Sequence, residues 1–146
     1  MKIDFYHLQS SPVAAVLPRI AERVLAGGGR LLVVSADPAQ RALIDRALWT
    51  YAPDSFLPHA ETGAGDDAAQ PVLIAAEPAP VNRADHVALI DGQWRDAALG
   101  FARAFHLFDD AAIDAARAAW RSLAATPDAE RRFWRQDGDG RWVQAA

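Results

Sequence analysis

The chain has 146 residues, a formal net charge of −4 at pH 7 and 51% hydrophobic residues, enough to bury a core without disulfides or a metal. Because it has no cysteine, a disulfide scaffold, a thiolate zinc site and cysteine catalysis are excluded. The negative charge argues against bulk binding to nucleic acid phosphates or anionic lipid. No apolar run approaches the ~20 residues of a membrane helix, and the first residues suit a strand better than a signal peptide. We expect a small cytoplasmic domain.

Hydrophobic spacing predicts strands that alternate with helices. Ile3 and Phe5 alternate with polar residues as in a strand, and the apolar run after Arg30 is typical of a strand buried on both faces. Each of the first two helices starts where a capping side chain precedes a proline, as at Asp37. In chain order we expect a strand at 2–7, a helix at 12–26, a strand at 30–35, a helix at 37–51, an acidic loop at 60–70, strands at 72–75 and 86–91, a helix at 95–105, a short strand at 106–109, a helix at 110–125, and a hairpin of strands 131–136 and 141–143.

This order implies an α/β fold, a three-layer Rossmann-like single domain over residues 1–146 with a mostly parallel central sheet. Such sheets often bind nucleotides at a glycine-rich first turn, but residues 6–12 contain no glycine, and the only lysine is Lys2. The four histidines are dispersed, and no serine lies in a nucleophile elbow. We expect no catalytic residue, no cofactor and no metal. A small nucleotide-dependent enzyme on the same fold remains the alternative.

One large aromatic side chain is predicted to face outward on the second helix. Trp49 falls roughly opposite the centre of the inward stripe at about 100° per residue. That stripe consists of Leu43, Ile44, Ala47, Leu48 and Tyr51. Phe56 follows in a turn-rich segment beside Pro58. Trp49 either packs under a neighbouring loop or belongs to a partner-binding patch, since aromatic residues dominate interface hot spots.

A second unusual surface is predicted on the last helix. Arg117, Trp120 and Arg121 stand at i, i+3 and i+4, so they share one strip with Ile113. The segment 131–135 adds the sequence Arg-Arg-Phe-Trp-Arg. This pattern describes either a solvated face on which arginine stems cover a ring, or a pocket for a short acidic peptide that carries an aromatic residue. Arginine interleaved with tryptophan also suits the stacking of single-stranded bases.

Several blocks of the sequence resemble the chi subunit family of the bacterial DNA polymerase III holoenzyme, an accessory protein of the clamp loader. The most specific block is Ala-Leu-Trp-Thr-Tyr at 47–51 followed by Asp-Ser-Phe-Leu-Pro-His at 54–59. Residues 5–8, 71–74 and 133–142 also fit, as does the late Arg-x-x-Trp helix. The resemblance extends over essentially the whole chain.

The resemblance implies a non-enzymatic adaptor. Chi proteins pair with the small psi subunit, which links them to the clamp loader, and they bind the acidic C-terminal tail of single-stranded-DNA-binding protein, which ends in Pro-Phe. DNA is then contacted only indirectly, no membrane is involved, and a helicase that shares the psi site is a further candidate partner. The resemblance implies that the psi or partner interface contains Trp49, Phe56, Pro58 and His59. It also implies a tail site at Arg117, Trp120, Arg121 and Ile113, the last in place of a lysine.

Overall fold

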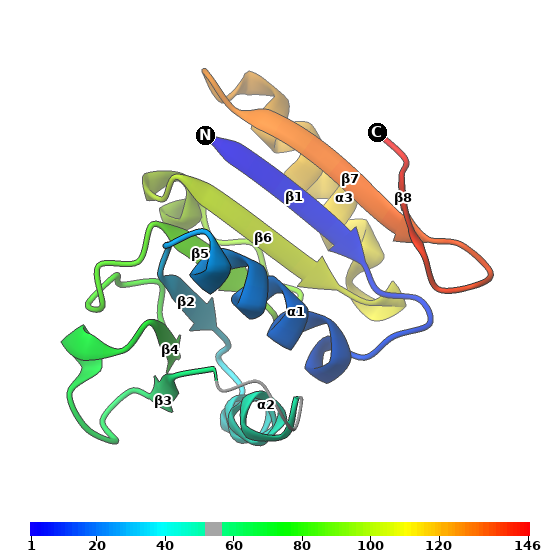
Figure 1. Cartoon of the computed structure of the whole chain (residues 1–146). Helices are drawn as coiled ribbons and strands as arrows, with labels where there is room; N and C mark the ends of the chain where they lie inside the picture. The colour runs from blue at the N-terminus through cyan, green and yellow to red at the C-terminus, as the bar shows by residue number, and fades with distance from the viewer. Residues whose placement is uncertain (52–56) are drawn as a thin grey trace.

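The structure is a computed structural model that describes residues 1–51 and 57–146. Within these residues, eight strands form one sheet in the order β3-β4-β2-β5-β6-β1-β7-β8 (Figure 1). Every neighbouring pair is parallel except β7 and β8. The elements are β1 (Lys2–His7), α1 (Val13–Ala26), β2 (Leu31–Val34), α2 (Pro38–Thr50), β3 (His59–Glu61), η1 (Asp67–Ala69), β4 (Val72–Ala75), β5 (His86–Leu89), η2 (Asp96–Gly100), β6 (Arg103–Phe108), η3 (Asp110–Ala112), α3 (Ile113–Ser122), η4 (Leu123–Ala125), β7 (Glu130–Gln136) and β8 (Trp142–Gln144).

The helices cover the two faces of the sheet and make three layers, which confirms the predicted α/β, Rossmann-like architecture. Helices α1 and α2 bury side chains such as Leu17 and Ile44 against one face. Helix α3 buries Ala116 against the other face, where Ile3 and Phe5 of β1 also point. Each large aliphatic or aromatic side chain fully removed from water contributes roughly 1.5–3 kcal/mol, so both interfaces stabilise the sheet.

Local signals explain where the helices begin. The carboxylate of Asp37 accepts a hydrogen bond of 2.9 Å from the backbone N–H of Ala39 and caps α2, as predicted. At α1 the capping position is taken by Pro12 in extended conformation, one residue later than expected from Ser11. None of the helices in the described residues is long and apolar enough to cross a membrane.

Two parts of the predicted element order are wrong. Residues 95–105 form the short η2 turn and then enter β6, instead of a helix, although Phe101 and Phe105 are spaced one helical turn apart. The reason is position, since β6 lies between β5 and β1 and is buried on both faces from Ala104 to Phe108. The predicted loop at 60–70 contains the end of β3.

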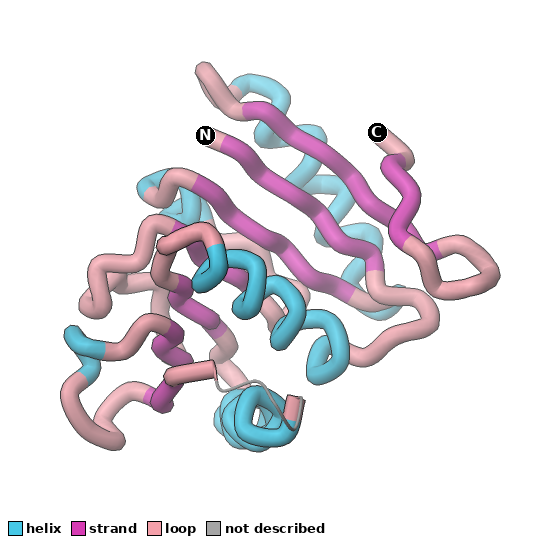
Figure 2. The backbone as a smooth tube through the Cα atoms, in the orientation of Figure 1, coloured by secondary structure: helices cyan, strands magenta, loops and turns pink. Residues whose placement is uncertain are grey.

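The predicted hairpin at the end of the chain is confirmed (Figure 2). Strands β7 and β8 pair antiparallel, and the turn between them is closed by Asp137, whose Oδ1 accepts hydrogen bonds of 2.9 Å from the backbone N–H groups of Asp139 and Arg141. Gly140 adopts φ +78°, a left-handed conformation that favours glycine. The hairpin thus extends the sheet beyond β1.

Candidate functional site

The first predicted surface lies on α2, near the β3 edge of the sheet. Trp49 is 57% exposed, as its position on the helix predicted. One edge of its indole ring meets the ring of His59, with the centroids 4.8 Å apart. Leu43, which was expected to face inward, is 46% exposed, so the apolar stripe of α2 is narrower than the spacing suggested.

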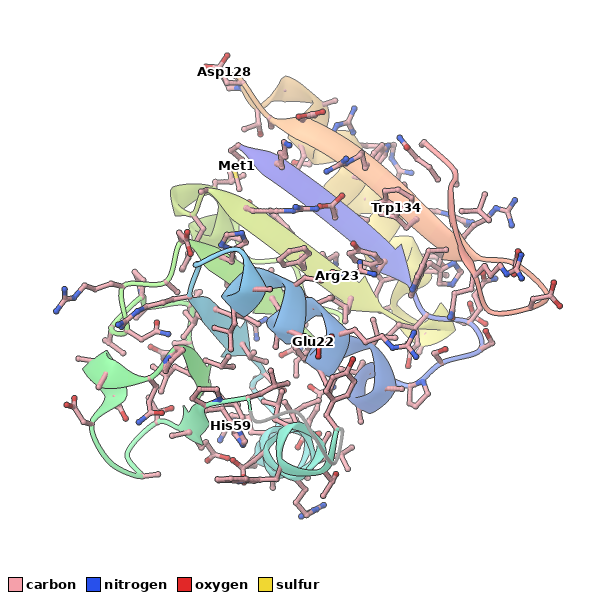
Figure 3. The ribbon with its side chains drawn as sticks, in the orientation of Figure 1. Met1, Glu22, Arg23, His59, Asp128 and Trp134 are labelled. Atoms are coloured by element: carbon pink, nitrogen blue, oxygen red, sulfur yellow. The ribbon has the colours of Figure 1, made fainter. Side chains whose placement is uncertain are left out.

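The side chain of His59 packs against Trp49 and contacts both α2 and the residues before β3. It is buried beside α2 (Figure 3), where its Nδ1 lies 2.6 Å from the carbonyl oxygen of Leu57. Its Nε2 lies 3.1 Å from the carbonyl oxygen of Asp45 and 3.2 Å from the Oδ1 of the same residue. The imidazole therefore connects β3 to α2 and contacts the ring of Trp49.

The structure brings together three of the four residues expected at the partner interface. Trp49 and His59 are in contact, and the half-buried Pro58 directly precedes His59. Phe56 lies outside the described residues. Large exposed aromatic side chains such as this indole are enriched at interface hot spots.

The second predicted surface lies between α3 and β7. The ring of Trp120 is partly buried, because it packs edge-on against Phe5 at 5.4 Å and Phe133 at 5.5 Å. Ile113 is also partly buried and packs into the same core. Arg117 and Arg121 are exposed, and the described part of the chain gives neither guanidinium group an ion pair or hydrogen bond.

Strand β7 adds a cation to this strip that helix spacing could not reveal. The guanidinium carbon of Arg131 lies 4.2 Å from the centroid of the Trp120 ring, and its Nη1 donates a hydrogen bond to the Trp120 carbonyl oxygen. The neighbouring Arg132 points to the opposite face of the sheet, where its Nε lies 3.0 Å from Oδ1 of Asp4. The period of two along a strand therefore divides the basic segment 131–135 between two surfaces.

The turn between β1 and α1 bears on the alternative that the protein is a nucleotide-dependent enzyme. In a Rossmann-like sheet the backbone N–H groups after β1 are the ones that meet a phosphate. Here the N–H groups of Gln9, Ser10 and Ser11 all donate to Oε1 of Gln136, at 3.0, 2.9 and 3.2 Å. The side chain of a β7 residue thus occupies the acceptor position, which disfavours a nucleotide-dependent enzyme.

His106 differs from His7, His59 and His86, each of which has a ring nitrogen within 3.2 Å of a carboxylate oxygen. His106 is fully buried among Phe5, Trp94 and Phe108, and neither ring nitrogen has a hydrogen-bond partner among the described residues. Burial lowers its pKa from 6.5 to about 4, so the ring is neutral at pH 7. Among residues 1–51 and 57–146, no group of three or more histidine, aspartate or glutamate side chains could hold a metal ion.

Comparison with known proteins gives the family. The family model described as "DNA polymerase III chi subunit, HolC" matches residues 1–127. A protein named DNA polymerase III subunit chi, from Pseudomonas aeruginosa, is 33% identical to this chain over 87 residues, which is 58% of this chain and 60% of that protein. The matched segment thus spans about three fifths of this curated relative. The chain belongs to the DNA polymerase III chi subunit family.

Proposed function

We propose that this chain is a non-catalytic replisome adaptor that binds the acidic C-terminal tail of single-stranded-DNA-binding protein and, through the psi subunit, the clamp loader. The observation that carries the proposal is the strip between α3 and β7. There two exposed arginines, Arg117 and Arg121, flank a partly buried tryptophan that Arg131 also covers.

The chemistry of this strip matches a tail that ends in Pro-Phe. Guanidinium groups donate two parallel hydrogen bonds to a carboxylate, and both Arg117 and Arg121 are exposed, so a carboxylate can reach them from solvent. A terminal phenylalanine ring would bury its apolar surface beside Trp120 and Ile113, worth ~2 kcal/mol. The terminal carboxylate then lies within the same cationic strip.

The Trp49 surface supports the second half of the proposal. It lies on α2, which packs on the opposite face of the sheet from α3 and near the other edge (Figure 1). Two partners that use these surfaces would not compete for space. We place psi, or a helicase that competes with it, on Trp49, Phe56, Pro58 and His59, and we place the complex in the cytoplasm with the replisome.

Fluorescence anisotropy with a labelled tail peptide tests the tail site. The intact chain should bind the peptide with micromolar affinity, and deletion of the terminal phenylalanine should abolish binding. Arg117→Ala should weaken binding severalfold, and the loss should shrink with added salt because charges are screened over about 10 Å at 0.1 M.

Arg46→Ala, which removes an exposed arginine from α2, is the matched control and should bind like the unaltered chain. If Arg117→Ala also binds the peptide like the unaltered chain at low salt, the tail site lies elsewhere and this half of the proposal is wrong.

A further inference from the structure

One face of the sheet is not covered by a helix over β1, β7 and β8. In Figure 1, α3 lies behind β1 and β7, whereas no helix of the described residues lies in front of β1, β7 and β8. Helix α1 borders this open face on the β6 side, and the β7–β8 hairpin borders it on the other. Figure 3 shows Arg23 of α1 and Trp134 of β7 on this same side.

Aromatic rings form a row across the open face. Tyr6 of β1 stacks on Trp134 with centroids 6.4 Å apart and planes at 13°, and it meets Trp142 of β8 edge-on at 5.0 Å. On its other side the ring of Phe105 lies 6.3 Å away. Tyr6, Trp134 and Trp142 are all only partly buried, so part of each ring remains exposed.

Arginines surround this row of rings. Arg19 and Arg23 project from successive turns of α1, and Arg141 projects from the end of the hairpin. All three are exposed, and none has an ion pair within the described residues. Burial and the charge of Asp4 raise the pKa of Tyr6, whereas the charges of Arg103, Arg23 and Arg132 act in the opposite direction.

The acidic groups on this face do not cancel the positive charge. Asp4 is fully buried and already accepts two hydrogen bonds from Arg103, at 2.7 and 2.9 Å, and one from the indole N–H of Trp134 at 3.0 Å. Asp139, on the hairpin turn, is the acidic member of the described residues that line the two cavities beside α1. A chain with net charge −4 therefore presents a locally positive surface here.

The surface is hollowed. Two cavities of about 100 Å³ and about 430 Å³ adjoin, because Tyr6, Ile20 and Arg23 line both of them. The larger cavity falls in the range of roughly 300–1,000 Å³ that is typical of ligand sites. Together they form a continuous groove beside α1, which we call the α1 groove.

We propose that the α1 groove binds single-stranded nucleic acid, with bases on the Tyr6, Trp134 and Trp142 rings and phosphates on Arg19, Arg23 and Arg141. Base stacking on aromatic side chains combined with a cationic track is the chemistry of sequence-tolerant single-strand binding. A duplex does not present its base faces to such rings, so the fit is to unpaired strands. This site goes beyond the proposed adaptor function, since it lies on the opposite face from the α3–β7 strip and contacts nucleic acid directly.

The test is anisotropy of a fluorescein-labelled oligothymidylate of about 12 nucleotides, titrated with the full chain at about 50 mM and 200 mM salt. The double variant Arg19→Gln/Arg23→Gln should weaken binding at least about fivefold and reduce the dependence of log affinity on log salt by about 1. Trp142→Ala should weaken binding at both salt concentrations, because stacking is not screened.

Arg117→Gln/Arg121→Gln is the matched control, since it removes the same charge from the opposite face, and it should leave oligothymidylate binding unchanged. Conversely, the Arg19/Arg23 double variant should keep its affinity for the acidic tail peptide, which separates this proposal from the adaptor proposal. Absence of saturable binding at 50 mM salt, or equal losses in the two double variants, would overturn the site. Displacement of the oligonucleotide by an acidic peptide that needs Arg19 and Arg23 would instead assign the groove to a peptide.

Discussion

The guanidinium group of Arg131 on β7 lies 4.2 Å above the indole of Trp120 on α3. The two residues belong to different elements, and the same guanidinium donates a hydrogen bond to the Trp120 carbonyl oxygen at the end of the helix. The cationic strip is thus built by docking a helix onto a strand, and its geometry depends on that contact as much as on the helix alone.

Arg131→Gln should therefore weaken the tail peptide's affinity severalfold and lower the free energy of unfolding by about 1 kcal/mol. The second effect is the loss of one cation–π contact and one hydrogen bond at a partly exposed site. Peptide anisotropy and urea titration measure the two effects. Arg135→Gln, at an exposed position four residues along the same strand, is the control, and both quantities should change little. Equal effects of the two substitutions would argue against a special role for the Arg131–Trp120 contact.

Trp49→Ala should abolish capture of the psi subunit while the domain stays folded. Truncation of an interface hot spot costs at least about 2 kcal/mol of binding free energy, whereas a residue that is 57% exposed adds little to stability. Leu43→Ala, on the same helix at 46% exposure, is the matched control. A pull-down and a urea titration decide between the two readings of Trp49. A loss of more than about 3 kcal/mol of unfolding free energy would make it a core residue.

The buried His106 should make the protein less stable in mild acid. Its pKa is about 4 in the folded state and 6.5 as the ordinary value, mainly because of burial, so between these values the unfolded chain binds the extra proton. Stability should fall by about 2 to 3 kcal/mol from pH 7.5 to pH 4.5 through this residue. His106→Leu should remove that part of the pH dependence in urea titrations. A variant with the same slope as the parent would assign the dependence to other groups.

Asp4→Asn should destabilise the fold without changing its shape. The carboxylate is fully buried between Arg103 and Arg132, and the amide would leave two guanidinium groups beside a neutral side chain. We expect a loss of about 3 kcal/mol, the lower end for breaking a buried pair, since both arginines keep part of their surface in water. Thermal or urea unfolding measures it. A loss below about 1 kcal/mol would show that Arg103 and Arg132 find other partners.

Much of the fold follows from local signals in the sequence. The Asp37 cap, the buried run of β2 and the Asp-Gly-Asp-Gly turn are each decided by neighbouring residues, and each was predicted correctly. The short strand predicted at 106–109 is the end of β6, but residues 103–105 were wrongly predicted as helix, because Phe101 and Phe105 match a helical spacing and only the position between β5 and β1 makes these residues a strand. The three residues of β3 are too few to show a period.

The candidate surfaces also contain some features that local sequence predicts and others that depend on how distant segments pack. The exposure of Trp49 and of Arg117 follows from helix periodicity, so the sequence alone predicted it. The pairing of Arg131 with Trp120, and the grouping of Tyr6, Trp134 and Trp142, depend on the register of distant strands. The alternation of β7 was the available signal, since it sends Arg131 and Arg132 to opposite faces.

An adaptor must hold two partners at once through two separate surfaces, and a three-component binding experiment measures this. The full chain is mixed with psi and labelled tail peptide, and the complex is followed by size-exclusion chromatography. The adaptor account predicts that all three elute together, that Arg117→Ala loses only the peptide, and that Trp49→Ala loses only psi. If psi and the peptide displace each other, or if either substitution releases both partners from a folded chain, the account is contradicted.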